Sequence, residues 1–382
     1  MSHSKIRALI LGGAALVVAQ GAEAQLSYSS GQPASPAYEG FVDNQDGSYE
    51  LVFGYMNKNW LEELDVPVGP DNYFSFTSPG GLDDLEVDAY DPAIADMGQP
   101  THFLPRRNRF SFSVRVPEHL GDRELVWTLK TRGETRRAFA TQRQDLLVDN
   151  MIIASETGAL GAGRSDPETR SNVPPMIEIE GDRVIEARVG QPVTLVARVT
   201  DDGLPLTLAQ RRERAAERRE AREAADLSDD DIDDDSDADH DPADIDGNGD
   251  EEDDDAAAEE EDEEEDEEEL SPEVQALQRA LREPGRVTVG KVVGLHYTWF
   301  VYRGTNTATF APIQIKPWED TRVWQNSPWA PSWVAPAVPE DGRWVVDVTF
   351  AEPGTYVLRG RADDGSLYAD QEVTVNVTPL LN

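Results

Sequence analysis

The sequence predicts an all-β protein with two β-sandwich domains. Short segments alternate apolar and polar residues, as in RFSFSVRVP at 109–117, and Gly, Asn and Asp turns separate them. Outside the charged middle of the chain, no helical period is sustained. Half-buried antiparallel strands without helices are typical of sandwiches, in which two sheets cover one core.

The first residues predict export. Lys5 and Arg7 precede an apolar run from Ala8 to Ala19, and Ala22-Glu-Ala24 matches an A-x-A cleavage site. This pattern indicates a secretory signal peptide at 1–24, which is too short to be read as a membrane span. We therefore expect a periplasmic or secreted protein with no membrane span after cleavage.

The N-terminal sandwich is predicted at 37–148. The segment GSYELVFGYMNKN follows the turn Asp46-Gly47, and ELVWTLKTRGETRRAFA is a hairpin that turns at Arg132-Gly133. Residues 149–174 are rich in Gly and Ser and are predicted to form a linker.

The second domain is predicted at 175–204 and 287–379. VGQPVTLVARV resembles strand B of immunoglobulin-like domains, and EPGTYVLRGRADDGSLYADQEVTVNV resembles their F–G hairpin, with Tyr356 at the tyrosine-corner position. The hairpin also resembles PKD-like and cadherin-like modules of bacterial surface proteins, although the WDFGDG signature of PKD domains is absent. The resemblance implies that Ala197 and Leu358 replace the two cysteines and that Trp299 is the buried tryptophan of strand C.

An insertion at 205–286 follows from the same resemblance. Immunoglobulin-like domains place little more than a dozen residues between the strand-B cysteine and the tryptophan, whereas Ala197 and Trp299 are 102 apart. The surplus is predicted to lie in the B–C loop as a helix, an acidic tract and a second helix. The first helix begins near a Thr207/Gln210 capping box, and the second runs from Ser271 to Pro284.

The acidic tract, Asp226–Glu269, dominates the charge of the protein. It holds 29 of the 75 acidic residues and no Lys or Arg, so it carries −29 of the net −41 and leaves −12 for the rest. Such a low-complexity segment is predicted to be disordered. Its partners would be cations or basic proteins, because like charge repels nucleic acid and anionic membranes.

Calcium is the one cofactor that the sequence suggests. The tract contains a D-x-D-x-N-G-D pattern that resembles the loops of dockerin or thrombospondin-type repeats. Alternate oxygen ligands in a tight turn suit calcium. Diffuse attraction of counterions to the tract is the alternative, and this interpretation is favoured. The candidate ligands are Asp244, Asp246, Asn248, Asp250 and Asp255.

A weaker cation site is suggested by two turns of the second domain. VTDDGLP and ADDGSLY would be neighbouring loops in an immunoglobulin-like fold. Asp before Gly also occurs because the carboxylate bonds to backbone amides in the turn, and this interpretation is favoured. The four candidates are Asp201, Asp202, Asp363 and Asp364.

A Trp-rich stretch is the candidate binding segment. Trp318, Trp324, Trp329 and Trp333 lie among prolines, and Trp344 follows. Trp on Pro-stiffened loops offers large contact area to a protein or sugar at low entropic cost. The favoured alternative is that these side chains cover a small core.

Two polar clusters of the first domain are given structural interpretations. Tyr55, Asn57, Asn59 and Trp60 resemble a sugar-binding set, but packing at a strand end is favoured. His102 beside 106–109, the run RRNR, has the charge to bind an anion, but a solvated basic loop is the favoured interpretation.

The sequence carries no strong signal for catalysis. There is no cysteine, no His pair at zinc spacing, no G-x-S-x-G and no phosphate-binding Gly loop with Lys. We therefore expect a non-catalytic binding or scaffolding protein of the cell envelope or extracellular space, with a protein or polysaccharide partner. The alternative is a carbohydrate-binding accessory protein that uses the Trp-rich stretch.

Overall fold

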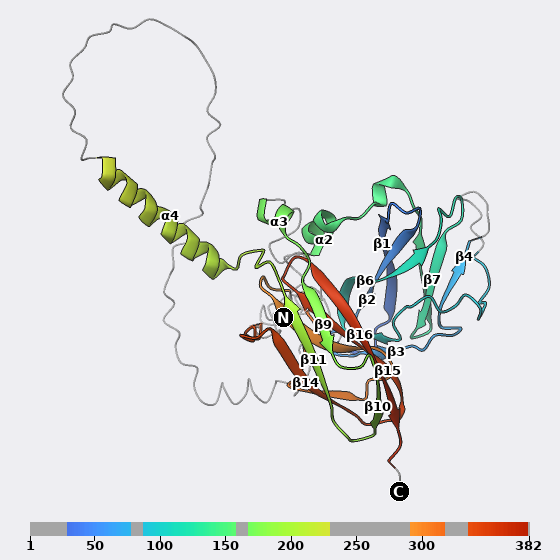
Figure 1. Ribbon diagram of the computed structural model, residues 1–382. Coiled ribbons are helices and arrows are strands. Elements are labelled where there is room, and N and C mark those ends of the chain that lie inside the picture. Colours follow the sequence, from blue (N-terminus) through green and yellow to red (C-terminus); the bar gives the residue numbers. More distant parts are fainter. Residues whose placement is uncertain (1–28, 78–86, 158–166, 230–290, 318–334, 381–382) are drawn as a thin grey trace, which may run out of the picture. The chain divides into compact units, whose positions relative to one another are not determined.

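The computed structural model describes residues 29–77, 87–157, 167–229, 291–317 and 335–380 (Figure 1). The chain divides into two compact units, one formed by Met1–Thr207 with Arg286–Asn382 and the other by Leu208–Gly285. Strands predominate over helices in the described residues, which confirms the predicted all-β class. No helix in these ranges is long and apolar enough to cross a membrane.

The N-terminal part of the first unit contains two three-stranded sheets, which we call the N-terminal sheet pair. A two-residue ribbon lies beside them, formed by β3 (Leu64–Asp65) and β5 (His102–Phe103). The strand orders are β1-β2-β6 and β4-β7-β8. Their bounds are β1 (Ala34–Asp43), β2 (Tyr49–Asn57), β4 (Asn72–Phe76), β6 (Arg106–Val116), β7 (Leu125–Thr131) and β8 (Glu134–Ala140).

Aromatic residues from both sheets form the core of this pair. Trp127 on β7 is fully buried, and the rings of Phe53 and Phe112 meet it edge-on at 6.1 and 5.1 Å. Its indole N–H donates to Asn72 Oδ1 at 2.9 Å, so the polar atom of the largest core side chain is satisfied.

The C-terminal part contains two four-stranded sheets, the C-terminal sheet pair. Their orders are β9-β11-β14-β13 and β10-β16-β15-β12. All neighbours are antiparallel except β10 and β16. The bounds are β9 (Met176–Glu180), β10 (Val184–Arg188), β11 (Val193–Thr200), β12 (His296–Arg303), β13 (Ala308–Ala311), β14 (Arg343–Phe350), β15 (Gly354–Asp363) and β16 (Tyr368–Thr378).

Alternating burial explains the second core. Leu195, Ala197 and Val199 of β11 face inward, while Thr194, Arg198 and Thr200 are exposed. Trp299 on β12 is 1% exposed and lies opposite Gly360 of β15. A Cβ at Gly360 would overlap the Tyr297 hydroxyl, so only glycine fits there.

The segment 149–174, predicted to be a linker, contains two short helices, α2 (Asn150–Thr157) and α3 (Pro167–Ser171). Asp149 caps α2, since its carboxylate accepts the Ile152 amide at 2.9 Å. Proline at the first position of α3 suits a helix start. These local signals outweighed the Gly- and Ser-rich composition on which the linker prediction rested.

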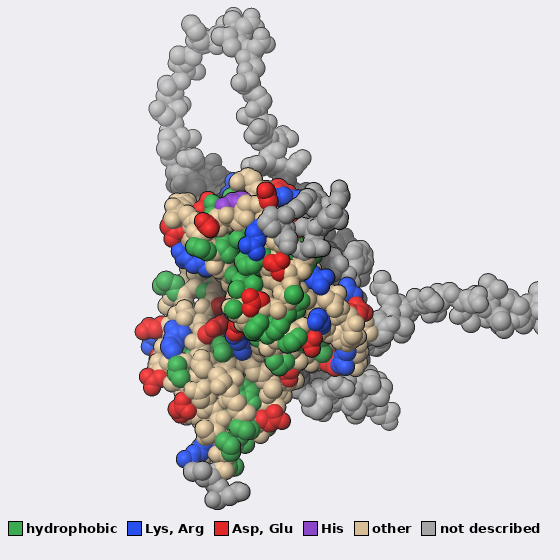
Figure 2. Space-filling view, turned by 90° about the vertical axis from the view of Figure 1, so that its right-hand side faces the viewer, with side chains coloured by type: hydrophobic (Ala, Val, Ile, Leu, Met, Phe, Trp, Pro, Cys, Tyr) green, Lys and Arg blue, Asp and Glu red, His purple; other side chains and the backbone are tan. Residues whose placement is uncertain are grey.

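The second unit contains α4 (Leu208–Asp229), which confirms the predicted first helix. Its side chains are exposed at 212–221, in keeping with the expected lack of an apolar stripe. The predicted second helix at 271–284 lies outside the described residues. On the face in Figure 2, acidic and basic side chains are interspersed, as expected for the modest charge outside the tract.

Removing Leu208–Gly285 is expected to leave the first unit folded, because neither large core cluster contains any of the described residues 208–229. Thr207 lies against Gly294, so a short Gly-Ser linker can rejoin the chain. Thermal unfolding of the deletion variant should stay cooperative, with a Tm within a few degrees of the full chain. A non-cooperative melt would contradict the division into these units.

Candidate functional site

The two sheet pairs share a buried junction that is centred on Tyr302. This β12 side chain is 4% exposed and belongs to the core of the N-terminal pair. Its hydroxyl donates to the Gly98 carbonyl, and its own carbonyl accepts the Thr101 amide at 3.1 Å. A side chain from one pair therefore completes the core of the other.

Charged side chains of β15 and β16 form the second layer of the junction. The Arg359 guanidinium stacks on the Tyr302 ring at 3.4 Å and donates to the Ser111 carbonyl and to Glu372. Arg361, 2% exposed, forms a two-pronged pair with Asp370, with both N–O distances 2.8 Å. Although burial opposes it, Arg361 lowers the pKa of Asp370, so this pair is ionised in the folded protein.

His102 lies at the edge of the same junction between two carboxylates. Its ring nitrogens are 2.8 Å from Glu63 Oε2 and 2.7 Å from Asp65 Oδ1. Although burial opposes it, hydrogen bonds with Asp65 and Glu63 raise the pKa of His102 to about 9. Asp65 Oδ2 also accepts the Asn306 amide at 3.0 Å, which links the cluster to the C-terminal pair.

The ribbon of β3 and β5 brings this cluster together, because Asp65 is directly opposite His102 in the register. The interpretation of His102 and 106–109 as a solvated basic loop is wrong. His102 is 3% exposed, and Arg107 and Arg109 pair with Glu39, whose side chain is 2% exposed. Sequence proximity suggested a basic patch, whereas His102, Arg107 and Arg109 have carboxylate partners about 40 to 70 positions away in the sequence. Arg106 lies over the Trp60 ring.

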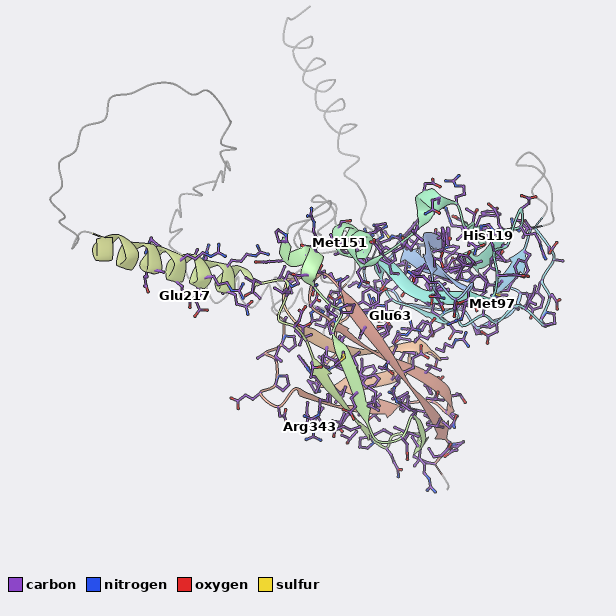
Figure 3. The ribbon with its side chains drawn as sticks, turned by 45° about the horizontal axis from the view of Figure 1, so that its top comes forward. Glu63, Met97, His119, Met151, Glu217 and Arg343 are labelled. Carbon is purple, nitrogen blue, oxygen red and sulfur yellow. The ribbon has the colours of Figure 1, made fainter. Side chains whose placement is uncertain are left out.

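A groove opens beside the junction and is the candidate binding site. It is a small groove, with a cavity volume of about 80 Å³. Glu63, labelled in Figure 3, lies between the strands of the two sheet pairs. Apolar and polar side chains from both pairs line it. They are Leu61, Glu63, His102, Leu104 and Pro105 from the N-terminal pair and Trp299, Phe300, Val301, Asn306, Phe310, Gln314, Ile315 and Lys316 from the C-terminal pair.

One wall of the groove is the free edge of β12, the last strand of its sheet. The Trp299 amide donates to Gln314 Oε1 at 3.0 Å, so a side chain occupies the place of a neighbouring strand. Lys316 donates to Asn108 Oδ1 at 2.9 Å and fixes this segment to the N-terminal pair. The buried indole N–H of Trp299 has no acceptor among the described residues.

The weaker cation candidates act as turn acceptors. Asp201, Asp202, Asp363 and Asp364 each accept a backbone amide two residues along the chain, at 2.6–2.9 Å. Burial, and then the neighbouring Asp363, raises the pKa of Asp364 to about 7. Within the described ranges, no group of three or more His, Cys, Asp and Glu side chains is placed to hold a metal ion. The loop at 244–255 lies outside those ranges.

Of the tryptophans in and after the Trp-rich stretch, the structure describes only Trp344. Trp318, Trp324, Trp329 and Trp333 lie outside the described residues, whereas Trp344 is 8% exposed and belongs to the C-terminal core.

The YMNKNW cluster has the structural role that was favoured. Asn57 and Asn59 are fully buried, and the side-chain amides donate to backbone carbonyls that include those of Phe103 and Gln32. These asparagines hold the strand end and its neighbouring segments together.

Sequence reasoning missed the groove. Its residues come from segments about 200 positions apart, such as Leu104 and Lys316, and no short motif connects them. The one available signal was the run Phe310–Lys316, in which apolar residues follow an edge strand. No family model matches the chain, and no curated protein is significantly similar to it.

The His102 cluster predicts a fall in stability at alkaline pH. Because the folded-state pKa of about 9 lies above the unfolded value of about 6.5, the folded state holds the proton more tightly. The stabilisation, on the order of 3 kcal/mol, is complete below about pH 6.5 and lost as the pH rises through 9. Urea unfolding at pH 6, 7.5 and 9.5 measures it.

The matched variants for this measurement are His102→Gln and His119→Gln. His102→Gln should flatten the pH dependence of the free energy of unfolding between pH 6 and 9.5. His119 is exposed, and His119→Gln should leave this pH dependence as in the wild type. Equal slopes for the wild type and His102→Gln would exclude the assigned role.

Proposed function

We propose that this chain is an exported, non-catalytic binding or scaffolding protein of the cell envelope or extracellular space. Its C-terminal sheet pair is an immunoglobulin-like sandwich, and the junction groove receives a segment of a protein partner. The groove is the observation that carries this proposal, because it combines half-buried apolar side chains with polar groups on rigid strands.

Strand order supports the immunoglobulin-like assignment. Constant-type domains pair strands A-B-E-D in one sheet and C-F-G in the other. In chain order, β9 and β11 to β16 correspond to A to G, and their sheets have these orders with β10 added beside β16. Tyr356 donates its hydroxyl to the Glu352 carbonyl at 3.0 Å, as in a tyrosine corner.

The same correspondence supports the insertion. The helix α4 lies between β11 and β12 in the chain, which is the connection from strand B to strand C. Without disulfides, packing must hold this fold together. Ala197 and Leu358, which stand at the positions of the two cysteines, are both fully buried and so contribute to that packing.

The groove suits an extended polypeptide with an apolar side chain. Phe310 and Ile315 are half-buried, so a partner can cover the area that they leave exposed. The exposed Asn306 and the half-buried Gln314 and Lys316 at the same site offer polar groups that orient a ligand.

A carbohydrate ligand is the second candidate. Lys316 and Pro317 end the described segment, and Trp318 follows them directly in the sequence. Trp and Phe side chains beside amide groups such as Gln314 are a chemistry that also suits sugar rings.

The test uses two isoleucines on one segment. Ile315 lines the groove, whereas Ile313 is 62% exposed and does not. A photo-crosslinking amino acid placed at Gln314 in the full chain identifies the occupant in cells. We expect Ile315→Asp to weaken crosslinking more than tenfold, since a charge replaces about 1.5–3 kcal/mol of apolar burial. Ile313→Asp should leave it unchanged.

Three outcomes distinguish the proposals. A protein adduct lost only in Ile315→Asp supports the protein-binding function. Retention of the chain on cell-envelope polysaccharide, with no protein adduct, supports the carbohydrate alternative. Equal loss in both isoleucine variants, at unchanged Tm, would remove the groove as the site.

Weak calcium binding by 244–255 is the remaining part of the proposal and rests on the sequence pattern. Calorimetric titration should give a Kd of about 10⁻⁴ to 10⁻³ M, the range of extracellular modules. Asp246→Ala removes a candidate ligand and should abolish the heat of calcium binding. Asp254→Ala changes a residue of the same range that is not a candidate ligand and should leave this heat unchanged. Equal effects of the two changes would indicate diffuse counterion attraction instead.

A further inference from the structure

Between Arg211 and Ala221, the helix α4 separates its charges onto two faces. Successive residues of a helix are rotated by about 100° around its axis. The described arginines of this stretch fall within a sector of about 160° around the axis, and the described glutamates fall within a sector of about 60° on the other side. We call the first set the arginine face and the second the glutamate face. The arginine face comprises Arg211, Arg212, Arg214, Arg218 and Arg219, and the glutamate face comprises Glu213, Glu217 and Glu220.

This pattern is unusual for a solvated helix. Side-chain pairs that stabilise an isolated helix join opposite charges three or four residues apart. Between Arg211 and Glu220, four of the five charged pairs at these spacings join like charges, as in Arg214–Arg218 and Glu213–Glu217. Arg214–Glu217 is the exception. Like-charge pairs at this spacing destabilise a helix by a few tenths of a kcal/mol each. The helix therefore gains stability from an anionic occupant on its arginine face.

Exposure is consistent with such an occupant. Arg212, Arg214, Arg218 and Arg219 are exposed in the structure, and Figure 3 labels Glu217 on the other face of α4. No apolar side chain on α4 between 209 and 221 is larger than alanine, so hydrophobic docking cannot cover this helix. Charge is what remains to attract a partner.

The chain itself supplies an anion directly after α4. Residues 230–269 contain 27 Asp and Glu and no Lys or Arg. Because these residues are covalently linked to the helix, their effective concentration at the arginine face is in the millimolar range. A chain of this length spans about 35 Å as a coil, which matches the length of a 22-residue helix, about 33 Å.

We propose that the arginine face of α4 is a docking surface for the acidic segment 230–269 of the same chain. The contact neutralises arginines that otherwise repel one another and brings the acidic segment back along the helix. A separate polyanion must displace this segment before it reaches the arginine face.

The sign of the salt response tests the contact. If the acidic segment does not dock on the helix, salt screens the repulsion within the segment and draws its residues closer to the helix. If the segment docks, salt weakens its ion pairs with the arginines and releases it. The chain has no cysteine, so Ala209→Cys and Ala257→Cys give a clean labelling pair for energy transfer in the full-length protein.

Energy transfer is expected to be high at 20 mM NaCl and to fall at 500 mM. Replacing all five arginines of the arginine face with Gln should lower the energy transfer at 20 mM NaCl to the high-salt value of the wild type or below it. In this variant, transfer should rise with salt instead of falling. Gln keeps a helix propensity close to that of Arg, and circular dichroism verifies that the helix remains.

The matched control removes charge from the opposite face. Glu213→Gln, Glu217→Gln and Glu220→Gln together should keep the transfer high and its fall with salt. The proposal is overturned if transfer rises with salt in the wild type, or if the glutamate variant loses transfer as fully as the arginine variant. It is also overturned if added polyglutamate binds the arginine face without changing the transfer.

Discussion

The insertion of Tyr302 into the N-terminal core is the contact on which the arrangement of the first unit depends. The residue belongs to β12 of the C-terminal pair, yet its side chain packs with the aromatic cluster around Trp127. Arg359 covers its outer face and binds the Ser111 carbonyl. Phe300 of β12 and Val357 of β15 also pack against this core. Several side chains of the C-terminal pair thus join the two cores, and both sheet pairs belong to one unit.

The groove is a consequence of that junction. His102 of β5 and Trp299, Phe300 and Val301 of β12 line it, together with residues of the segment that ends at Lys316. The Glu63–His102–Asp65 cluster lines one side and fixes the ribbon through Asn306. Charge pairing at the junction and space for a ligand thus have the same structural origin.

Period-2 alternation was sufficient to predict the all-β class and many individual strands, including β6 and β11. The helix α4 could also be predicted, since its composition and start signal agree. The short helices after Asp149 were missed, because a single capping carboxylate is a weak signal within a Gly- and Ser-rich segment.

The site was harder to predict than the strands. The burial of His102 depends on carboxylates at Glu63 and Asp65, about 40 positions away, and only the β3–β5 pairing brings them together. The role of Tyr302 depends on a second core that its own strand does not reveal. Alternation specifies which side of a strand faces inward, but not which of two cores it faces.

The side-chain amide of Gln314 has a further effect at the edge of β12. An uncovered edge strand is a template on which the strands of other molecules can add and so begin an aggregate. The Trp299 amide donates to Gln314, and the Tyr302 carbonyl accepts the Thr101 amide, so two hydrogen-bonding groups of this edge are occupied within the molecule. The contacts that shape the groove therefore also oppose aggregation, because they make this edge strand a poorer template for a second molecule.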